Sequence, residues 1–456
     1  MQPAQATTAK GERRRAAPAQ RKRSGNARKG ASSASAPSTG ALLAWAFAIP
    51  LVAHLAVLAV KLANAPAMPW TQLVPLGIHA ATLLVAWAWL KLTRFGGDAT
   101  PLAAALGLAG IGIAMQMRLG SYAGASPLSM QLMAYPIGVA ALLATMLLFG
   151  NGRAAALARL GWLAYAGAIA ALAAMLVLGH RYRGGVYMAG NLNPSEIVKP
   201  LMVLFLAAFL SGRQKEFSAA QAGIPMPDKT SLCILAVSWA LPMAMVMMLH
   251  DLGLLILLNA VLVVMLYAIT RRLGYLLIGA AGVTGFAIAA GRLSSHAQAR
   301  FAAWSSPFAD PTGKGWQICQ SLTALYSGGA CGAGLGRGTP QSVPIVSSDF
   351  VYAAFGEELG FIGCALIVAL FAVLFARGWR IAETASGGPF GQLLGAGITA
   401  TLAIQTLLNI GGVTKAIPLT GITLPFLSQG GSSLAVSLAL VGLLVALSSR
   451  GSRGSR

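Results

Sequence analysis

Only eleven acidic residues occur among the 456, so each carboxylate that could do chemistry can be considered separately. Five of them fall in segments that we expect to be solvated: Glu12, Asp98, Glu216, Asp228 and Glu383. A carboxylate at the end of a long apolar stretch is costly, and it marks a pathway, a binding site or a paired structural lock. The six that remain are Glu196, Asp251, Asp310, Asp349, Glu357 and Glu358.

Asp310 stands in the turn-rich sequence Ser-Pro-Phe-Ala-Asp-Pro-Thr-Gly, residues 306–313. Such a sequence can hold a carboxylate at a fixed place. Arg300 and Lys314 flank it, and these cations could hold a phosphate while the carboxylate accepts a proton. General-base chemistry beside an anion site is therefore one interpretation. Composition alone favours the other, a turn-forming Asp before Pro.

Glu196 and Lys199 lie three residues apart after Asn193-Pro194-Ser195, a sequence typical of a helix start. The spacing puts both side chains on one helix face, where they can pair. A self-satisfied ion pair and a ligand-facing role both remain open. Asp251 precedes another apolar stretch, where helix capping is the simpler interpretation.

Glu357 and Glu358 lie in the tenth apolar stretch. We expect one of them to face a polar cavity, and a plain helix-end pair is the alternative.

The composition excludes an ordinary soluble protein. Hydrophobic residues make up 56% of the chain and charged residues 10%, against about a quarter in soluble proteins, and the mean hydropathy is +0.70. A net charge of +22 would suggest a nucleic-acid partner in a soluble protein. Because most of this chain is apolar, we expect a membrane protein without a nucleic-acid partner. Four Cys rule out a disulfide scaffold, and no Cys/His cluster offers a zinc site. Cys319 and Cys331 could pair or remain free.

Twelve apolar stretches approach the roughly 20 residues that a helix needs to cross the hydrocarbon. We therefore predict an all-α polytopic membrane protein with about twelve transmembrane helices. Continuous apolar runs disfavour a closed barrel. The predicted spans are 41–63, 70–93, 101–118, 127–149, 154–178, 195–212, 230–249, 251–270, 273–291, 350–376, 391–412 and 429–449.

The distribution of Lys and Arg predicts the orientation. Residues 1–40 form a basic segment that cannot bury a core and lacks the pattern of a secretory signal, so we expect a disordered cytoplasmic tail. Both termini, including the basic tail 450–456, are then cytoplasmic. Every loop after an even-numbered span agrees with the positive-inside rule. These loops contain Lys91, Arg94, Arg153, Arg213, Lys215, Arg271, Arg272, Arg377 and Arg380.

The same count places the long segment 292–349 outside the membrane. It is rich in Gly, Ser and Pro and shows no obvious periodicity. Long loops of this kind are usually functional or disordered. Its aromatic residues Trp304, Phe308, Trp316 and Tyr326 argue for order at the membrane surface. This loop is the leading site candidate.

Several motifs occur in order along the chain. They are Asn-Pro-Ser-Glu at 193–196 with Lys199, His-Asp-Leu-Gly at 250–253, Asp310-Pro311 with Gly313, Gly315 and residues 317–321, Ser-Asp-Phe at 348–350 with Gly-Glu-Glu-Leu-Gly at 356–360, and residues 418–433. Together they resemble the SEDS family of shape, elongation, division and sporulation proteins, the FtsW/RodA/SpoVE group. The C-terminal motif, residues 418–433, is long and highly specific. Four positions depart from the family's usual residues: Asn193, His250, Ser306 and Ser347.

The resemblance covers residues 101–449 and implies a ten-helix core that includes loop 292–349, with residues 41–93 forming two additional N-terminal helices. It implies a peptidoglycan glycosyltransferase that polymerises lipid II at the outer face of the bacterial cytoplasmic membrane, in elongation or division. The implied partner is a class B penicillin-binding protein, a transpeptidase. By its Asp-Pro-x-Gly context, Asp310 takes the place of the family's essential acidic residue. Glu196 and Lys199 take the places of residues that line the family's central cavity.

The implied reaction joins the 4-hydroxyl of one lipid II to the anomeric carbon of the growing chain, with inversion and loss of undecaprenyl pyrophosphate. Asp310 is the predicted general base. Cations must stabilise the leaving pyrophosphate, directly or through Mg or Mn, although no residue spacing demonstrates a metal site. The predicted substrate-binding residues are Arg300, Lys314, Arg337, Glu196, Lys199, Asp251, Asp349, Glu358, Ser432 and Ser433.

Two other functions fit the sequence. Many spans with charges at broken helix starts also describe a carrier, here a lipid II flippase. The predicted outer position of Asp310 favours chemistry, because a carrier's charged site should lie near the midplane. The third possibility is a noncatalytic scaffold for the penicillin-binding protein.

Overall fold

A computed structural model describes residues 38–64, 73–120, 130–182, 185–187, 193–221, 224–293 and 295–449. Residues 1–37 of the predicted tail 1–40 and the predicted tail 450–456 lie outside this part of the chain, whereas Thr39 and Gly40 already belong to the first helix. The remainder, from Thr39 onward, forms one compact unit.

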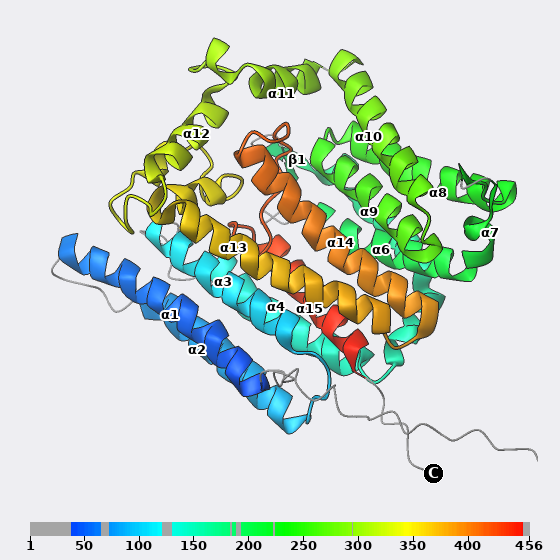
Figure 1. Cartoon of the computed structure of the whole chain (residues 1–456), viewed down its shortest axis with the longest axis horizontal. Helices are drawn as coiled ribbons and strands as arrows, with labels where there is room; N and C mark the ends of the chain where they lie inside the picture. Colours follow the sequence, from blue (N-terminus) through cyan, green and yellow to red (C-terminus); the bar gives the residue numbers. More distant parts are fainter. Residues whose placement is uncertain are drawn as a thin grey trace, which may run out of the picture. The chain divides into compact units, whose positions relative to one another are not determined.

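Within the described ranges, twelve long helices lie at the positions of the twelve predicted spans (Figure 1). Among the described residues, eleven segments are long and apolar enough to cross a membrane, and α10 contributes a shorter apolar stretch, Leu273–Gly285. The chain is therefore a multi-pass membrane protein. The helices are α1 Thr39–Asn64, α2 Val74–Leu92, α3 Thr100–Arg118, α4 Met130–Phe149, α5 Gly161–Leu178, α6 Ser195–Gly212, α8 Lys229–Met248, α9 Leu252–Thr270, α10 Leu273–Leu293, α13 Val351–Thr384, α14 Gly388–Val413 and α15 Gly431–Ser448.

Short elements fill the connections. An eight-residue 3₁₀ helix, Arg153–Leu160, leads into α5, and two small antiparallel hairpins pair His180 with Tyr187 and Ala220 with Pro225. The hairpin strands are β1 His180–Tyr182, β2 Gly185–Tyr187, β3 Ala220–Gln221 and β4 Ile224–Pro225, and the short helices are α7 Gln214–Ser218, α11 Ser295–Ser305 and α12 Trp316–Gly328, with 3₁₀ turns at Pro307–Ala309 and Pro340–Ser342.

Local sequence explains several helix starts. Asp228 caps α8 by accepting hydrogen bonds from the backbone N–H groups of Thr230 and Ser231, both at 3.0 Å. Asp251 caps α9 by accepting from the N–H of Leu254 at 2.9 Å, as its position before an apolar stretch predicted. Carboxylates also suit the positive end of the helix dipole.

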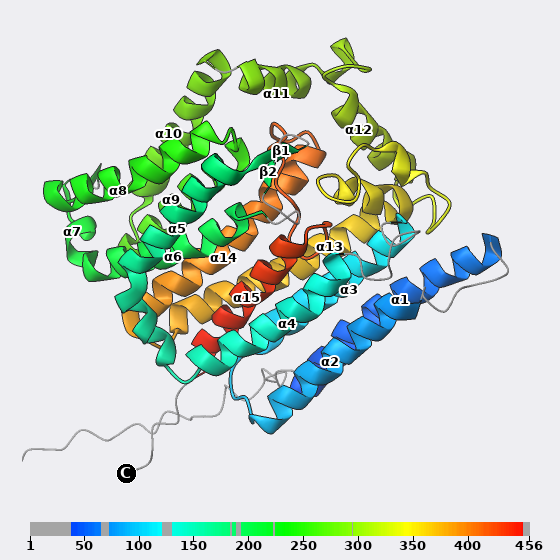
Figure 2. The same cartoon turned by 180° about the vertical axis from the view of Figure 1, so that it is seen from behind.

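Helix α3 is the central helix, and 94% of its most apolar 18-residue stretch is buried. Its Ala- and Gly-rich sequence explains this position, because small residues let neighbouring backbones approach closely. Gly112, for example, lies so close to the α14–α15 connection that a Cβ there would sit 2.6 Å from the carbonyl oxygen of Phe426. Helices α13 and α15 pack on α3, and α4 packs along α15 (Figure 2).

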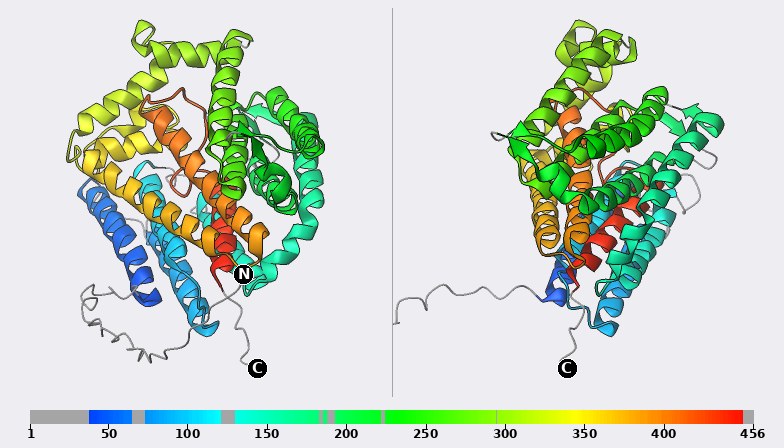
Figure 3. Two further views of the ribbon diagram at one scale, coloured as in Figure 1. Left: turned by 45° about the vertical axis from the view of Figure 1, so that its right-hand side comes forward. Right: turned by 90° about the vertical axis from the view of Figure 1, so that its right-hand side faces the viewer.

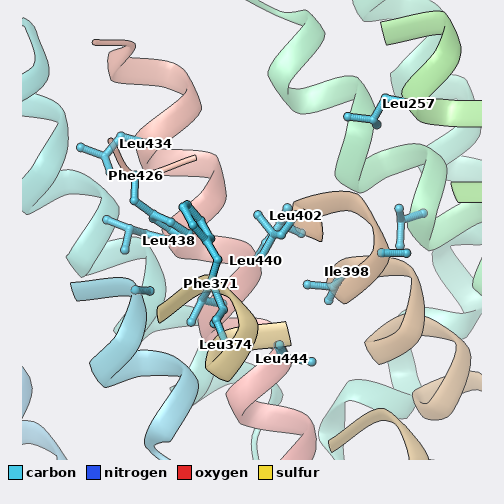
Figure 4. Packing of buried hydrophobic residues seen from close by; sticks show 14 of the residues in the cluster. Leu257, Phe371, Leu374, Ile398, Leu402, Phe426, Leu434, Leu438, Leu440 and Leu444 are labelled. Carbon is cyan, nitrogen blue, oxygen red and sulfur yellow. The ribbon is translucent and has the colours of Figure 1, made fainter. Parts of the chain in front are cut away.

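Large apolar side chains fill the space between α13, α14 and α15 (Figure 4). Phe371 of α13 and Phe426 of the α14–α15 connection are each about 2% exposed or less, and their ring centroids lie 6.4 Å apart. Leu438 and Leu444 of α15 join the same cluster. This core fixes the helices whose ends carry the predicted site.

The two additional N-terminal helices pack against the rest of the bundle, α1 on α3 and α2 on α4 (Figure 1). Three buried polar rings lie in this contact. The Nδ1 of His79 lies 3.0 Å from the hydroxyl of Tyr135 on α4, and His54 stacks on His79 with ring centroids 6.3 Å apart. Polar contacts between apolar helices fix register, so α1 and α2 have a defined position on the core.

Two features differ from the sequence prediction. The segment 292–349 was expected to lack periodicity, yet it contains α11 and α12, which lie beyond the end of the bundle (Figure 3). The predicted span 350–376 is interrupted at Gly360, whose φ of 68° and ψ of −168° are not helical. Glu357 and Glu358 therefore belong to a short helical segment before the break, and the apolar run follows it.

Candidate active site

The predicted site residues lie at one end of the bundle, which we call the loop side. It carries α11 and α12, the first residues of α6, α9 and α15, and the last residues of α3 and α14. By the positive-inside pattern, this side is predicted to lie outside the membrane.

Asp310 is held in a tight turn on the loop side. One carboxylate oxygen accepts a hydrogen bond from the backbone N–H of Lys314 at 3.0 Å, and the backbone carbonyl of Asp310 accepts from Gly315 at 3.0 Å. Gly313 packs directly on the carboxylate, where a Cβ would lie 2.5 Å from Oδ1. Asp310 is nevertheless exposed. The turn thus presents a fixed carboxylate to solvent.

The sequence placed Arg300 beside Asp310, and in the structure its guanidinium binds the α14–α15 connection. Its guanidinium donates a hydrogen bond to the carbonyl of Leu419 at 2.7 Å, in the α14–α15 connection. Four residues later on α11, Trp304 donates to the carbonyl of Lys415 at 3.1 Å. Both contacts dock α11 on the end of α14, and they turn Arg300 toward the bundle.

Asp251 and Asp349 face Arg300. Burial lowers the pKa of the Arg300 guanidinium, and the two carboxylates act against that effect. Burial likewise raises the pKa of Asp251, while its hydrogen bond from Leu254 and the charges of Lys199 and Arg300 act to lower it. Burial also raises the pKa of Asp349, which Ser348 and Arg300 oppose. These groups form a desolvated cluster of mixed charge.

Glu196 and Lys199 extend this cluster from α6. Their side chains form the predicted ion pair, with Nζ to Oε2 at 2.6 Å, and both are nearly buried. Lys199 also donates to the Oε1 of Gln405 on α14 at 3.0 Å. We call Glu196, Lys199, Asp251, Arg300 and Asp349 the central cluster. The structure brings these five predicted residues together.

Buried amides and hydroxyls that the sequence analysis did not single out frame the cluster. Asn409 donates to the carbonyls of Asp349 and Ile422 at 2.9 and 2.8 Å, and Gln405 donates to the carbonyl of Thr423 at 3.0 Å. Gln116 of α3 donates to the carbonyl of Ser347 at 2.7 Å. The signal in the sequence was an amide inside an otherwise apolar span, which needs a buried partner.

The two predicted serines lie at the start of α15. Ser433 is buried, and its hydroxyl lies 3.1 Å from that of Thr423. Ser432 is half-buried in the first turn of the helix. Both directly follow the α14–α15 connection that also receives Arg300.

Glu358, which the sequence analysis predicted to bind substrate, is held in an ion pair. Its side chain is fully buried and forms an ion pair with Arg118 of α3 at 2.7 Å. Arg118 additionally donates to the carbonyl of Gly338 at 3.1 Å. Glu357 accepts a hydrogen bond from the backbone N–H of Thr339 at 2.7 Å. Both carboxylates therefore hold the loop against α13 and α3.

The remaining predicted cations are surface residues. Lys314 and Arg337 are exposed, and Lys314 contacts Asp310 through its backbone. Cys319 and Cys331 are free thiols. In the part of the chain that the structure describes, no three His, Cys, Asp or Glu side chains gather as metal ligands.

A pocket enclosing about 570 Å³, open solvent included, lies at the opposite end of the bundle. Gln214, Arg271, Trp379, Glu383 and Gln392 line it together with apolar residues. None of the predicted site residues borders it, so the chemistry that the sequence predicts belongs to the loop side.

Comparison with known proteins decides the family. The model of the FtsW/RodA/SpoVE family, described as cell cycle proteins, matches residues 104–453. The chain belongs to this family. The match covers α3 to α15 and leaves α1 and α2 outside.

Relatives within the family support the assignment. The chain is 39% identical over 261 residues to the peptidoglycan glycosyltransferase RodA of Mycobacterium tuberculosis, a match that covers 57% of this chain and 55% of that protein. It is 39% identical over 268 residues to the stage V sporulation protein E of Bacillus subtilis, covering 57% and 69%. The chain thus spans about half the length of the mycobacterial relatives that it matches.

Solved structures share the fold of this family member. A chain from a peptidoglycan synthase complex, studied for how polymerization and crosslinking are coordinated, superposes with a TM-score of 0.61 at 23% identity, over 79% of this chain and 99% of that one. The rod shape determining protein RodA of Thermus thermophilus gives 0.55 at 22% identity, over 77% and 96%. The FtsW/RodA/SpoVE fold is thus present in this chain.

Proposed function

We propose that this protein is a peptidoglycan glycosyltransferase that polymerises lipid II into glycan strands, in elongation or division. Membership of the FtsW/RodA/SpoVE family supports the reaction class. The observation that carries the proposal is the exposed Asp310 carboxylate, fixed by the N–H of Lys314 on a turn beyond the apolar helices. Both proposed substrates carry polyprenyl tails, which explains why such an enzyme is a bundle of membrane helices.

In the proposed reaction, the 4-hydroxyl oxygen of one lipid II attacks the anomeric carbon of the growing chain. The new C–O bond forms as the bond from that carbon to undecaprenyl pyrophosphate breaks, and the configuration inverts. The hydroxyl proton passes to Asp310. A hydroxyl is a poor nucleophile at neutral pH, and a positioned base typically accelerates such a step about 10²–10⁴-fold.

The leaving pyrophosphate gains negative charge, which cations must stabilise. Lys199 and Arg300 supply positive charge in the central cluster, and desolvation strengthens their effect. Exposed Lys314 and Arg337 add charge along the loop. We assign the first pair to the pyrophosphate and the second to attracting the anionic substrate.

The described residues do not form a ready metal site, because no group of three potential ligands gathers there. Mg²⁺ usually keeps several waters and binds through one or two carboxylates plus substrate phosphates. A divalent cation would therefore enter with the pyrophosphate, and the steps above do not depend on one.

We further propose that both termini are cytoplasmic, that the loop side faces outward from a bacterial cytoplasmic membrane, and that the partner is a class B penicillin-binding protein. The positive-inside pattern supports the orientation. The partner is supported by the structural neighbour that comes from a peptidoglycan synthase complex.

The test is polymerisation of purified lipid II by the purified chain, with and without the transpeptidase, and with and without Mg²⁺ or Mn²⁺. We expect long glycan strands on gels, produced most rapidly with the partner present. Movement of lipid II across vesicles without polymer would support the flippase. Binding of the transpeptidase without polymer or transport would support the scaffold.

Replacing Gly313 by Ala tests whether the position of Asp310 matters. The added methyl group overlaps the carboxylate, so Asp310 must leave the N–H of Lys314. We expect a loss of polymerisation rate approaching about 10²-fold, the cost of moving a catalytic group by roughly 1 Å. The steady-state rate with lipid II checks this prediction. An unchanged rate would show that the turn does not position the base.

A further inference from the structure

The first N-terminal helix contacts the outer loop. Val60 of α1 packs on Gly336, whose φ is +79°. A Cβ at Gly336 would overlap Cγ1 of Val60 and lie 2.9 Å from its Cγ2. One turn earlier on α1, Val57 and Leu58 are buried against Met117 of α3, with Leu335 of the loop packed on the same cluster. Residues 335–336 of the loop are thus pressed between α1 and α3.

The same stretch of loop is also held by α3 and α13. Arg118 donates to the carbonyl of Gly338, and Thr339 donates its N–H to Glu357. The N–H groups of Ala333 and Gly334 donate to the carbonyls of Glu357 and Glu358 at 2.8 and 3.1 Å. The segment 333–339 is therefore held in place by contacts with α1, α3 and α13.

Rigid contacts continue from this segment to Asp310. Gly328, at the end of α12, lies directly against the carbonyl of Gly356 on α13, with no room for a side chain. The N–H of Phe361 donates to the carbonyl of Gly329 at 2.9 Å. Helix α12 begins at Trp316, immediately after the turn of Asp310. Packed elements that move together can transmit a displacement, here from segment 333–339 along α12 to the turn of Asp310.

We propose that α1 positions the outer loop for polymerisation, with Val60 on Gly336 as the contact through which it acts. The family match begins at residue 104, so this contact belongs to the additional helices of this chain and not to the family core. The proposal rests on the proposed function, and it gives α1 a role in the reaction. Val60 is a positioning residue that acts through the loop.

A double-mutant cycle tests the contact. Gly336→Ala creates the overlap with Val60, and we expect kcat for polymerisation to fall about 10- to 100-fold, with the KM for lipid II little changed. Val60→Ala removes both γ-carbons, leaving the closest remaining atom, Cβ, at 3.0 Å. We therefore expect the double variant to recover at least half of the lost kcat on a logarithmic scale.

Two matched controls separate the contact from general effects. Gly152 has a similar φ of +82° with open space around it, so Gly152→Ala measures backbone strain alone and should leave kcat unchanged. Val52 of α1 is 67% exposed, so Val52→Ala measures the loss of a valine that does not touch the loop. Equal kcat losses in Gly336→Ala with and without Val60→Ala, in folded protein, would overturn the proposal.

Hydrogen exchange provides a readout that does not depend on activity. We expect Val60→Ala to speed amide exchange in residues 333–339, and Val52→Ala to leave it unchanged. Faster exchange in Val60→Ala, together with a wild-type chain that polymerises nothing, would support the contact while rejecting the proposed function. Unchanged exchange in Val60→Ala would overturn the positioning role even if the wild-type chain polymerises lipid II.

Discussion

Replacing Asp310 by Asn is expected to lower the rate of glycan polymerisation by about 10²–10⁴-fold, the contribution of a general base. Asn has nearly the same shape, and its side-chain oxygen can still accept the hydrogen bond from the N–H of Lys314. The turn should therefore persist while the proton acceptor is lost. Initial rates with purified lipid II, at equal amounts of folded protein, measure the effect.

Asp228→Asn is the matched control. Asp228 caps α8 at the opposite end of the bundle, and Asn caps helices equally well. We expect this variant to polymerise at the wild-type rate with an unchanged thermal midpoint. Wild-type activity in Asp310→Asn would keep the glycosyltransferase and discard Asp310 as its base, leaving the chemistry to the central cluster.

Replacing Arg118 by Ala is expected to destabilise the folded protein by about 3–5 kcal/mol, because the Glu358 carboxylate stays buried without its partner. The side chain of Glu358 is 0% exposed and that of Arg118 is 13% exposed, so solvent cannot replace the ion pair. The variant also loses the hydrogen bond to Gly338. Thermal unfolding in detergent, followed by helical circular dichroism, measures the change.

Two further variants show whether the unpaired buried charge causes the loss of stability in Arg118→Ala. Arg377 pairs with Asp98 at 3.5 Å with side chains 36% and 27% exposed, and such a pair contributes less than about 1 kcal/mol. Arg377→Ala should therefore shift the thermal midpoint far less than Arg118→Ala. The double variant Arg118→Met/Glu358→Leu should be more stable than Arg118→Ala, since it leaves no unpaired buried charge. Equal midpoints for Arg118→Ala and Arg377→Ala would show that the ion pair contributes little.

The sequence by itself determined the features that depend on near neighbours in the chain. Apolar runs of about 20 residues must form helices in a membrane, because the hydrocarbon satisfies no backbone hydrogen bond. The three-residue spacing of Glu196 and Lys199 made their ion pair predictable. The position of Asp251 before an apolar run predicted its cap in the same way. The motif around Asp310 identified the candidate base, and its tight turn follows from Pro and Gly nearby.

Only the tertiary structure decided which distant groups meet. Arg300 lies near Asp310 in sequence, yet it binds the carbonyl of Leu419, 119 residues away. The ion pair of Glu358 with Arg118 of α3 was likewise not predictable from near neighbours in the chain. The packing of Val60 on Gly336 also joins a helix and a loop that no local pattern links. Hydropathy and helical periodicity report which face of an element is apolar, whereas the partner of a buried charge depends on how the helices pack, and that packing is a property of the whole chain.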